Sequence, residues 1–186
     1  MTVLRDLGAE VREINLPAVQ HAGAIFLTIL LAEAVAYHEN WMRERPGKYG
    51  RDMWRRLLPG LGFSALDYVH AQRGRTLLFR QIDEAMKTVD FIATPTMPRT
   101  GMTFAESQVA PPVPSSPFTR LANITGQPSI SLPCGFHEGL PIGLLLTGRA
   151  FEEAAVLRIA NAYEKATEWH RRRPDWDFAT ATTRMG

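Results

Sequence analysis

Nucleophilic catalysis needs a serine or cysteine beside a base, and few residues of this sequence could form that pair. Ser115 and Ser116 are adjacent, but prolines flank them, so their backbone N–H groups cannot form the donor nest that an oxyanion requires. The lysines, Lys48, Lys87 and Lys165, all lie in polar helical surroundings that keep an ammonium group solvated and protonated. We therefore predict no catalytic residue in this sequence.

Metal and cofactor chemistry has equally little support. The five histidines form no ligand pair at helical spacing, and no HExxH, CxxC or glycine-rich phosphate loop occurs, so we expect neither a metal nor a cofactor. Cys134 is the single cysteine and follows a proline in an apolar stretch, which predicts a small buried thiol rather than a nucleophile. A lone cysteine also favours a reducing, cytoplasmic location.

The composition is that of an ordinary globular protein. Of 186 residues, 45% are hydrophobic and 22% charged, which predicts one domain over residues 1–186 with a frayed tail at 175–186. The formal charge of +2 is too small to suggest a nucleic-acid partner. No signal peptide is expected after Met1, and the apolar stretch at residues 24–36 contains Thr28 and Glu33 and is too short for a membrane span.

Hydrophobic periodicity predicts alternating helices and strands. Strands are expected near residues 10–16, 90–95, 129–133 and 142–147, with a tight return between the last two. Helices are expected at about 19–44, 48–58, 65–87, 119–124 and 151–169, the third with Ser64 as its N-cap. Gly74 lies within that third helix and costs about 1 kcal/mol relative to alanine unless packing requires it.

Three short motifs make the sequence recognisable. They are NITGQP at residues 123–128, SLPCG at 131–135 and GLPIG at 139–143, followed by a helix that carries Tyr163 and Glu164. In this order and spacing they resemble the C-terminal portion of the amidase signature family, which includes general amidases and glutamine-using amidotransferase subunits. The resemblance implies an α/β fold: a mixed β-sheet flanked by helices on both faces, as part of the larger amidase signature fold.

The resemblance also implies a reaction, which is amide C–N hydrolysis through an acyl-serine formed by a Ser-Ser-Lys arrangement. In family members the lysine and the glycine-rich serine segment lie in the N-terminal half, and neither occurs in this sequence. The chain is therefore expected to contribute a wall of the substrate pocket and to be inactive alone. The alternative is a non-catalytic binding or assembly module that retains the fold.

The pocket residues that the resemblance implies are few. Arg56 lies in a segment that, in the amidotransferase subunits, carries an arginine for the substrate carboxylate, and a solvated helix face is the alternative. Thr94, Pro95, Thr96 and Phe118 are the other candidates, with structural turns as the alternative.

One departure from the amidotransferase pattern concerns the substrate. Those subunits carry an acidic residue, for the substrate ammonium, at the position that Ser116 occupies here. A serine carries no charge, which points to a small-molecule amide less polar than glutamine.

The elements expected here belong to a larger sheet, and this predicts uncovered surface. At least one strand edge and one apolar helix face should lack their usual covering. A truncated or split amidase of this kind is expected to pair with an N-terminal half or to self-associate.

Overall fold

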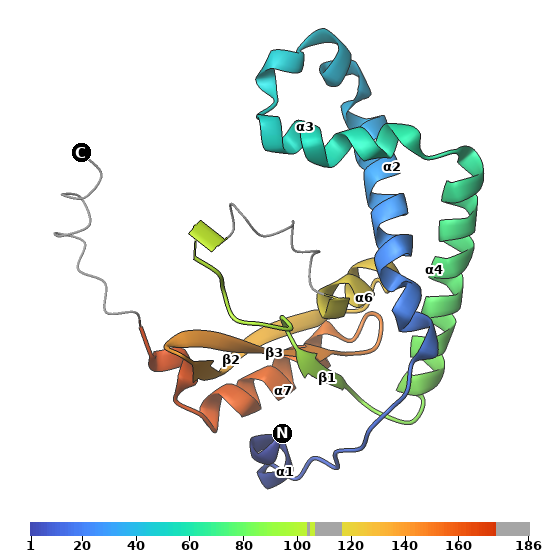
Figure 1. Ribbon diagram of the computed structural model, residues 1–186. Coiled ribbons are helices and arrows are strands. Elements are labelled where there is room, and N and C mark those ends of the chain that lie inside the picture. Colours follow the sequence, from blue (N-terminus) through green and yellow to red (C-terminus); the bar gives the residue numbers. More distant parts are fainter. Residues whose placement is uncertain (104, 107–116, 174–186) are drawn as a thin grey trace, which may run out of the picture.

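Figure 1 shows the computed structural model of the chain, which describes residues 1–103, 105–106 and 117–173. The helices and short 3-10 turns are α1 (Thr2–Asp6), η1 (Pro17–His21), α2 (Ala22–Glu44), η2 (Pro46–Lys48), α3 (Arg51–Leu57), η3 (Leu58–Gly62), α4 (Ala65–Met86), α6 (Pro117–Thr125), α7 (Glu153–Lys165) and η4 (Trp169–Arg171). The strands are β1 (Ile92–Pro95), β2 (Ser129–His137) and β3 (Leu140–Thr147). This arrangement confirms the α/β class. Ser115, Ser116 and the predicted tail at 175–186 lie outside the described residues.

The three strands form one sheet in the order β1-β3-β2. Both pairings are antiparallel, whereas a mixed sheet was expected. The turn between β2 and β3 is the predicted tight return: Glu138 and Gly139 both have positive φ, the backbone that two-residue hairpins need for their right-handed twist.

The strand expected at residues 10–16 does not form. Two of its apolar side chains, Ile14 and Leu16, pack against the cluster of Ile82, Met86 and Ile92 where α4 leads into β1. An alternating apolar pattern predicts one buried face and does not specify what buries it. In this segment that partner is the end of a helix.

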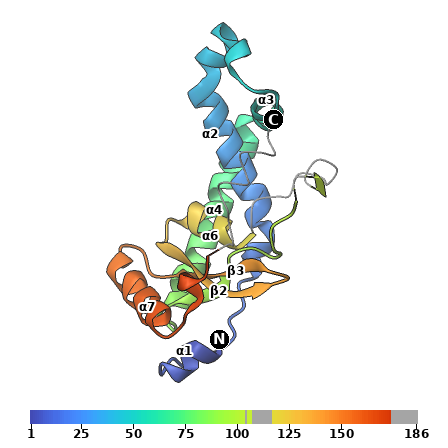
Figure 2. The same cartoon turned by 90° about the vertical axis from the view of Figure 1, so that its left-hand side faces the viewer.

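Helices cover both faces of the sheet. On one face, α1 and α7 pack against the strands through a core of buried side chains: Leu4, Leu132, Leu144, Leu146, Ala160 and Tyr163. On the other face, Ile92 of β1 meets α4, and Leu121 of α6 packs beside it. Figures 1 and 2 show α7 on one side of the sheet and α4 and α6 on the other.

Helices α2, α3 and α4 form an arm that projects from the sheet, with α3 at its far end (Figures 1 and 2). Two glycines set its packing. A Cβ on Gly60 would lie 2.5 Å from the carbonyl oxygen of Leu31, and one on Gly74 would lie 2.8 Å from Ile25. Packing thus requires the glycine within α4, which offsets its low helix propensity.

Helix α4 begins at the predicted N-cap. Ser64 Oγ accepts a hydrogen bond from the backbone N–H of Asp67 at 3.1 Å, and the backbone N–H of Ser64 donates to Asp67 Oδ2 at 2.9 Å. This reciprocal capping box satisfies two donors that a helix end otherwise leaves unpaired.

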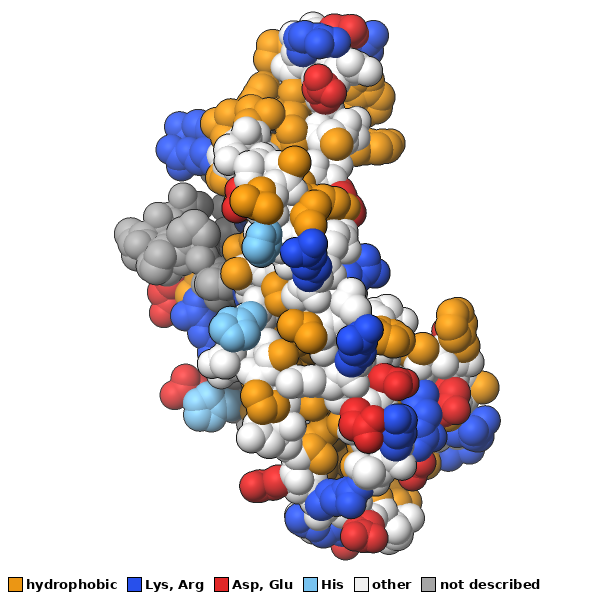
Figure 3. All heavy atoms as spheres, turned by 90° about the vertical axis from the view of Figure 1, so that its right-hand side faces the viewer, with side chains coloured by type: hydrophobic (Ala, Val, Ile, Leu, Met, Phe, Trp, Pro, Cys, Tyr) orange, Lys and Arg blue, Asp and Glu red, His pale blue; other side chains and the backbone are white. Residues whose placement is uncertain are grey.

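The arm exposes many apolar side chains. Figure 3 shows them along its outer side, interspersed with basic ones. The segment Pro17–Glu44 is long and apolar enough to cross a membrane by length and composition alone, with a mean hydropathy of 1.6 in its best window. Among the described residues, α2 lies against α4 and α6, and Tyr68 of α4 donates a hydrogen bond to Glu33 at 2.8 Å. The apolar stretch expected to be too short for a membrane span is thus part of a longer helical segment.

Candidate functional site

One face of the sheet carries a group of hydroxyl side chains, which we call the hydroxyl face: Thr94, Thr96, Ser129, Ser131 and Thr147. In the strand register, Thr94 and Ser131 flank Leu145 of the central strand. Thr96 Oγ1 and Ser131 Oγ lie 2.6 Å apart, and Ser129 Oγ and Thr147 Oγ1 lie 2.7 Å apart. Side chains alternate across a strand, so these residues share the face that is opposite to the core packed on α7.

Gly143 makes the closest of these contacts possible. It lies beneath the hydroxyls of Thr96 and Ser131, and a Cβ there would approach them to 2.5 Å and 2.8 Å. The backbone N–H of Thr96 also donates to the carbonyl oxygen of Gly143 at 2.8 Å, although Thr96 lies just beyond the end of β1. The backbone pairing of the two strands thus continues one residue beyond the end of β1.

Helix α6 flanks the same face. Its buried Ile124 packs against Leu78 of α4, and the neighbouring Leu121 packs beside Ile92. The helix also contacts β3. Phe118, in its first turn, is half-buried, as are Thr94 and Thr96, whereas Pro95 is exposed. The structure therefore places Thr94 and Thr96 on the hydroxyl face and Phe118 on the adjacent helix. Pro95 is paired with Leu144 and lies on the opposite face of the sheet.

Arg56 is not part of this group. It is exposed on α3, at the end of the arm remote from the sheet (Figures 1 and 2). Its neighbour Leu57 is buried, and Trp54 Nε1 donates a hydrogen bond to the carbonyl oxygen of Pro46 at 3.0 Å. Leu57 and Trp54 therefore hold α3 in place. The described part of the chain does not bring Arg56 to the hydroxyl face, and its assignment to the pocket stays a prediction.

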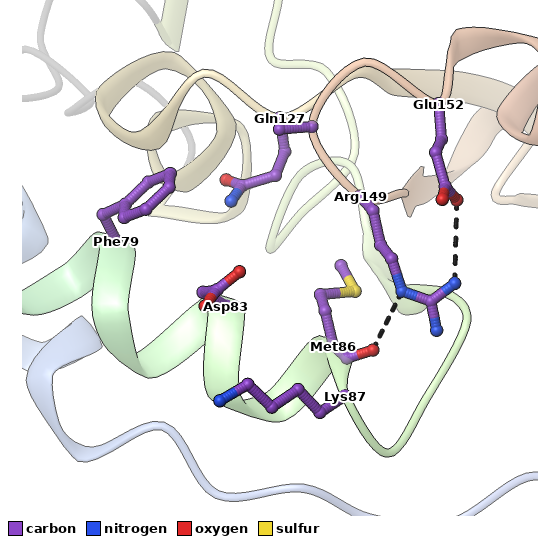
Figure 4. A pocket seen from close by; sticks show the side chains of 8 residues that line it. Phe79, Asp83, Met86, Lys87, Gln127, Arg149 and Glu152 are labelled. Atoms are coloured by element: carbon purple, nitrogen blue, oxygen red, sulfur yellow. Dashed lines mark hydrogen bonds and ion pairs between the residues drawn. The ribbon is translucent and has the colours of Figure 1, made fainter.

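A hollow of about 320 Å³ lies elsewhere, between the end of α4 and the turn after β3 (Figure 4). Its lining residues are Phe79, Asp83, Met86, Lys87, Gln127, Arg149, Ala150 and Glu152. Arg149 donates to the carbonyl oxygens of Met86 and Val89 and pairs with Asp90 at 3.1 Å and Glu152 at 3.6 Å. These contacts tie the α4–β1 connection to the β3–α7 turn, which explains Arg149 structurally.

A second hollow, of about 580 Å³, begins three residues after Thr96. Its lining residues are Arg99, Thr100, Gly101, Met102, Thr103, Glu106, Glu138 and Leu140. Hydrogen bonds from the backbone and side chain of Thr103 lower the pKa of Glu106 below its usual value. This hollow adjoins the strand end that carries the predicted Thr94–Pro95–Thr96 segment.

No described residue is arranged to generate a nucleophile. All three lysines are exposed, and Lys87 pairs with Glu84 at 2.6 Å, a hydrogen bond that raises the pKa of its ammonium. Cys134 packs against the core, and burial raises the pKa of its thiol, so the reactive thiolate is disfavoured. Among residues 1–103, 105–106 and 117–173, no cluster of three or more potential metal ligands occurs.

Three residues of the hydroxyl face, Ser129, Ser131 and Thr147, were not among the predicted site residues, and neither was Gly143 beneath it. Ser131 was assigned only to the polar side of a strand, and Gly143 only to a motif. The alternation Ser129-Ile130-Ser131 does carry a signal, because it places both hydroxyls on one face. The contact with Thr96 does not follow from the sequence, because it depends on β1 and β2 flanking the same central strand.

Comparisons with known proteins show the family of the chain. The family model described as Amidase matches residues 1–157. Similar curated relatives include a glutamyl-tRNA(Gln) amidotransferase subunit of Roseiflexus sp. (strain RS-1), 37% identical over 93% of this chain and 41% of that protein. An amidase of Pseudomonas putida is 38% identical over 92% of this chain and 39% of that protein. The chain thus spans about two fifths of the length of these relatives.

Solved structures of similar fold come from the same family. A crystal structure of an amidase superposes with a TM-score of 0.78 at 25% identity, covering 88% of this chain and 39% of that one. The corresponding glutamyl-tRNA(Gln) amidotransferase subunit of Thermotoga maritima superposes with a TM-score of 0.68 at 30% identity, covering 88% and 36%. With the family match over most of its length, the chain belongs to the amidase family.

Proposed function

We propose that this chain is the C-terminal part of an amidase-type hydrolase and forms one wall of its substrate pocket. The single observation that carries the proposal is the family match over residues 1–157, which covers the whole sheet and α6. In this proposal the Ser-Ser-Lys machinery comes from the N-terminal portion of an amidase fold, which attacks the amide carbonyl and forms an acyl-serine. Water then hydrolyses the acyl group after the amine has left.

The hydroxyl face and α6 are suited to hold an uncharged amide. Hydroxyl groups both donate and accept hydrogen bonds, so Thr94 and Thr96 can bind an amide N–H or a carbonyl oxygen. Phe118 supplies an apolar surface beside them. Ser116, which lies outside the described residues, brings no charge for a substrate ammonium, and this supports a substrate less polar than glutamine.

Arg56 has a conditional role in this proposal. Its guanidinium can bind a carboxylate bidentately, but only if the N-terminal portion places α3 over the same pocket as Thr94. Without that placement the residue is part of a solvated helix face, as its exposure in this chain would allow.

A non-catalytic module is the second candidate, and the exposure of all three lysines favours it for the chain alone. Reading the DNA upstream of the Met1 codon distinguishes the two. An in-frame glycine- and serine-rich segment with a preceding lysine supports the amidase. An unrelated upstream gene supports the module.

Complementation tests the proposal directly. We would co-express this chain with the N-terminal portion of the Pseudomonas putida amidase, which is 38% identical where it matches, and measure release of an aromatic amine from aryl amides. Turnover is expected from the pair and none from either part alone. Robust turnover by this chain alone would overturn the proposal, and a pair that associates without turnover would favour the non-catalytic module.

A further inference from the structure

Helix α2 carries an exposed apolar stripe that no described element covers. We call Leu27, Leu30, Tyr37 and Trp41 the α2 stripe; their exposed fractions are 43%, 45%, 80% and 57%. Spacings of 3, 7 and 4 residues place the four side chains on one side of the helix. The opposite side contacts η3 and α4, where Val35 is buried and Ile25 packs against Gly74.

A row of exposed large apolar side chains is unusual on the surface of a monomeric protein. Tyrosine and tryptophan are the side chains most often found at the energetic centre of protein interfaces, because each buries a large area with few rotatable bonds. The stripe runs about 21 Å along the helix, taking ~1.5 Å per residue. A stable interface needs roughly 800 Å² from each partner. The stripe can therefore be the centre of such an interface, with neighbouring surface completing it.

The comparisons indicate what covers the stripe. About three fifths of the length of the matched relatives lies beyond the part that this chain covers, so the complete family fold includes a large portion with no counterpart in this sequence. We propose that the α2 stripe is the surface that binds the N-terminal portion of an amidase fold. This inference rests on the proposed function. The portion can be joined to this chain or be supplied by a separate one.

A lipid bilayer fits the stripe less well. Glu33 lies beside the stripe on α2, and its carboxylate accepts a hydrogen bond from Tyr68, which in turn accepts one from Gln72. A polar network at this position suits a protein partner, because burying a carboxylate in hydrocarbon is costly.

Side-chain contacts also connect the stripe to α3. A chain of aromatic contacts leads from the stripe to α3: the ring of Trp41 lies 6.3 Å from His38, His38 lies 5.7 Å from Tyr49, and Tyr49 lies 5.8 Å from Trp54. His38 Nδ1 and Tyr49 Oη are also within hydrogen-bond distance, at 2.9 Å. A partner that covers Tyr37 and Trp41 therefore also fixes α3, the helix that carries Arg56.

The test measures association rather than activity. The affinity-tagged full chain is mixed with the N-terminal portion of the Pseudomonas putida amidase, and the dissociation constant is measured by titration calorimetry. The double variant Leu30→Asp/Tyr37→Asp should weaken binding at least tenfold. The matched control Leu77→Asp replaces a leucine of α4 that is 59% exposed, and it should bind as the unmodified chain does. Circular dichroism confirms that each variant keeps its helical content.

Three results would overturn the inference. The first is equal behaviour of the unmodified chain and the double variant in the titration, whether both bind or neither binds. The second is a dimer of this chain in light scattering that the double variant abolishes, which would make a second copy the occupant. The third is sedimentation with phosphatidylcholine–phosphatidylglycerol vesicles that the double variant abolishes, which would make a bilayer the occupant. Association without amide turnover, in contrast, would reject the proposed function but would still support the stripe as the binding surface.

Discussion

Gly143 determines how closely two strands can bring their hydroxyl groups together. Its missing side chain leaves room for Thr96 and Ser131 to contact each other across the central strand. The proposed pocket wall thus depends on a residue that has no functional group of its own.

Replacing Gly143 with alanine should therefore be costly. The new Cβ would lie 2.5 Å from Thr96 Oγ1, so the hydroxyls must separate. Overpacking of this kind typically costs about 1–3 kcal/mol of the free energy of unfolding. Urea denaturation measures the loss. Gly62→Ala is the matched control, because no atom lies within 4 Å of its added Cβ, and an equal loss in both variants would contradict the steric explanation.

Cys134 provides a test of burial. Desolvation raises the pKa of its thiol, so at pH 8 a smaller fraction is thiolate than in a free cysteine. Iodoacetamide should alkylate the folded chain more slowly than it alkylates an unstructured cysteine peptide, and the difference should vanish in urea. Alkylation of the folded chain at the peptide rate would show that the thiol is solvated.

Several individual residues could be assigned from the sequence alone. Ser64 was recognised as an N-cap, because a cap depends on neighbours a few residues away. Cys134 was expected to be buried and is half-buried against the core. The partnership of Thr96 with Ser131 could not be predicted, because 35 residues separate them and only strand order brings them together.

Helix α4 shows how a local signal fixes an element. Its capping box holds the carboxylate of Asp67 through hydrogen bonds from the side chain and backbone of Ser64. These bonds lower the pKa of Asp67 below its ordinary value of 3.8. The box and the close contact of Gly74 with Ile25 together determine where α4 begins and how it packs on α2.

This lowered pKa gives stability a defined pH dependence. A carboxyl group whose folded pKa lies below its unfolded value contributes stability that is fully present above the unfolded pKa and is lost as pH falls through the folded one. The urea concentration at the midpoint of unfolding should therefore decrease as the pH is lowered below about 4, near the unfolded pKa of aspartate. Asp67→Asn should reduce this dependence. The control Asp6→Asn alters an aspartate outside the box, and an equal effect from both would contradict the assignment.

Among the elements, those with a strong internal pattern were predicted well. Helices α2, α4, α6 and α7 and the β2–β3 hairpin follow from periodicity and turn residues. The failure at residues 10–16 has a different origin. A strand needs a neighbouring strand with free hydrogen-bonding groups, and the local sequence says nothing about whether one is present.

The described part of the chain is an arm attached to a small sheet, and both have surface that lacks a partner among the described residues. The α/β class was predictable, because the three motifs resemble a family with that fold and the expected helices and strands alternate. The antiparallel pairing and the distance of Arg56 from the sheet were not, because both depend on contacts between remote segments.

Binding of an N-terminal portion should stabilise the chain by mass action. A partner that binds only the folded state adds about 2.7 kcal/mol at a concentration of 100 times Kd. Differential scanning fluorimetry should show a melting temperature that rises with partner concentration. The double variant Leu30→Asp/Tyr37→Asp should show little rise. An equal rise in both proteins would place the interface away from α2.

The two outer strands each contain a proline, Pro95 in β1 and Pro133 in β2. Proline has no N–H group, so each margin of the sheet is one donor short of a complete hydrogen-bonding row. Fibril growth requires an uninterrupted row to template the next molecule, and here both margins interrupt it. We therefore expect this chain, despite its exposed apolar side chains, to resist cross-β aggregation.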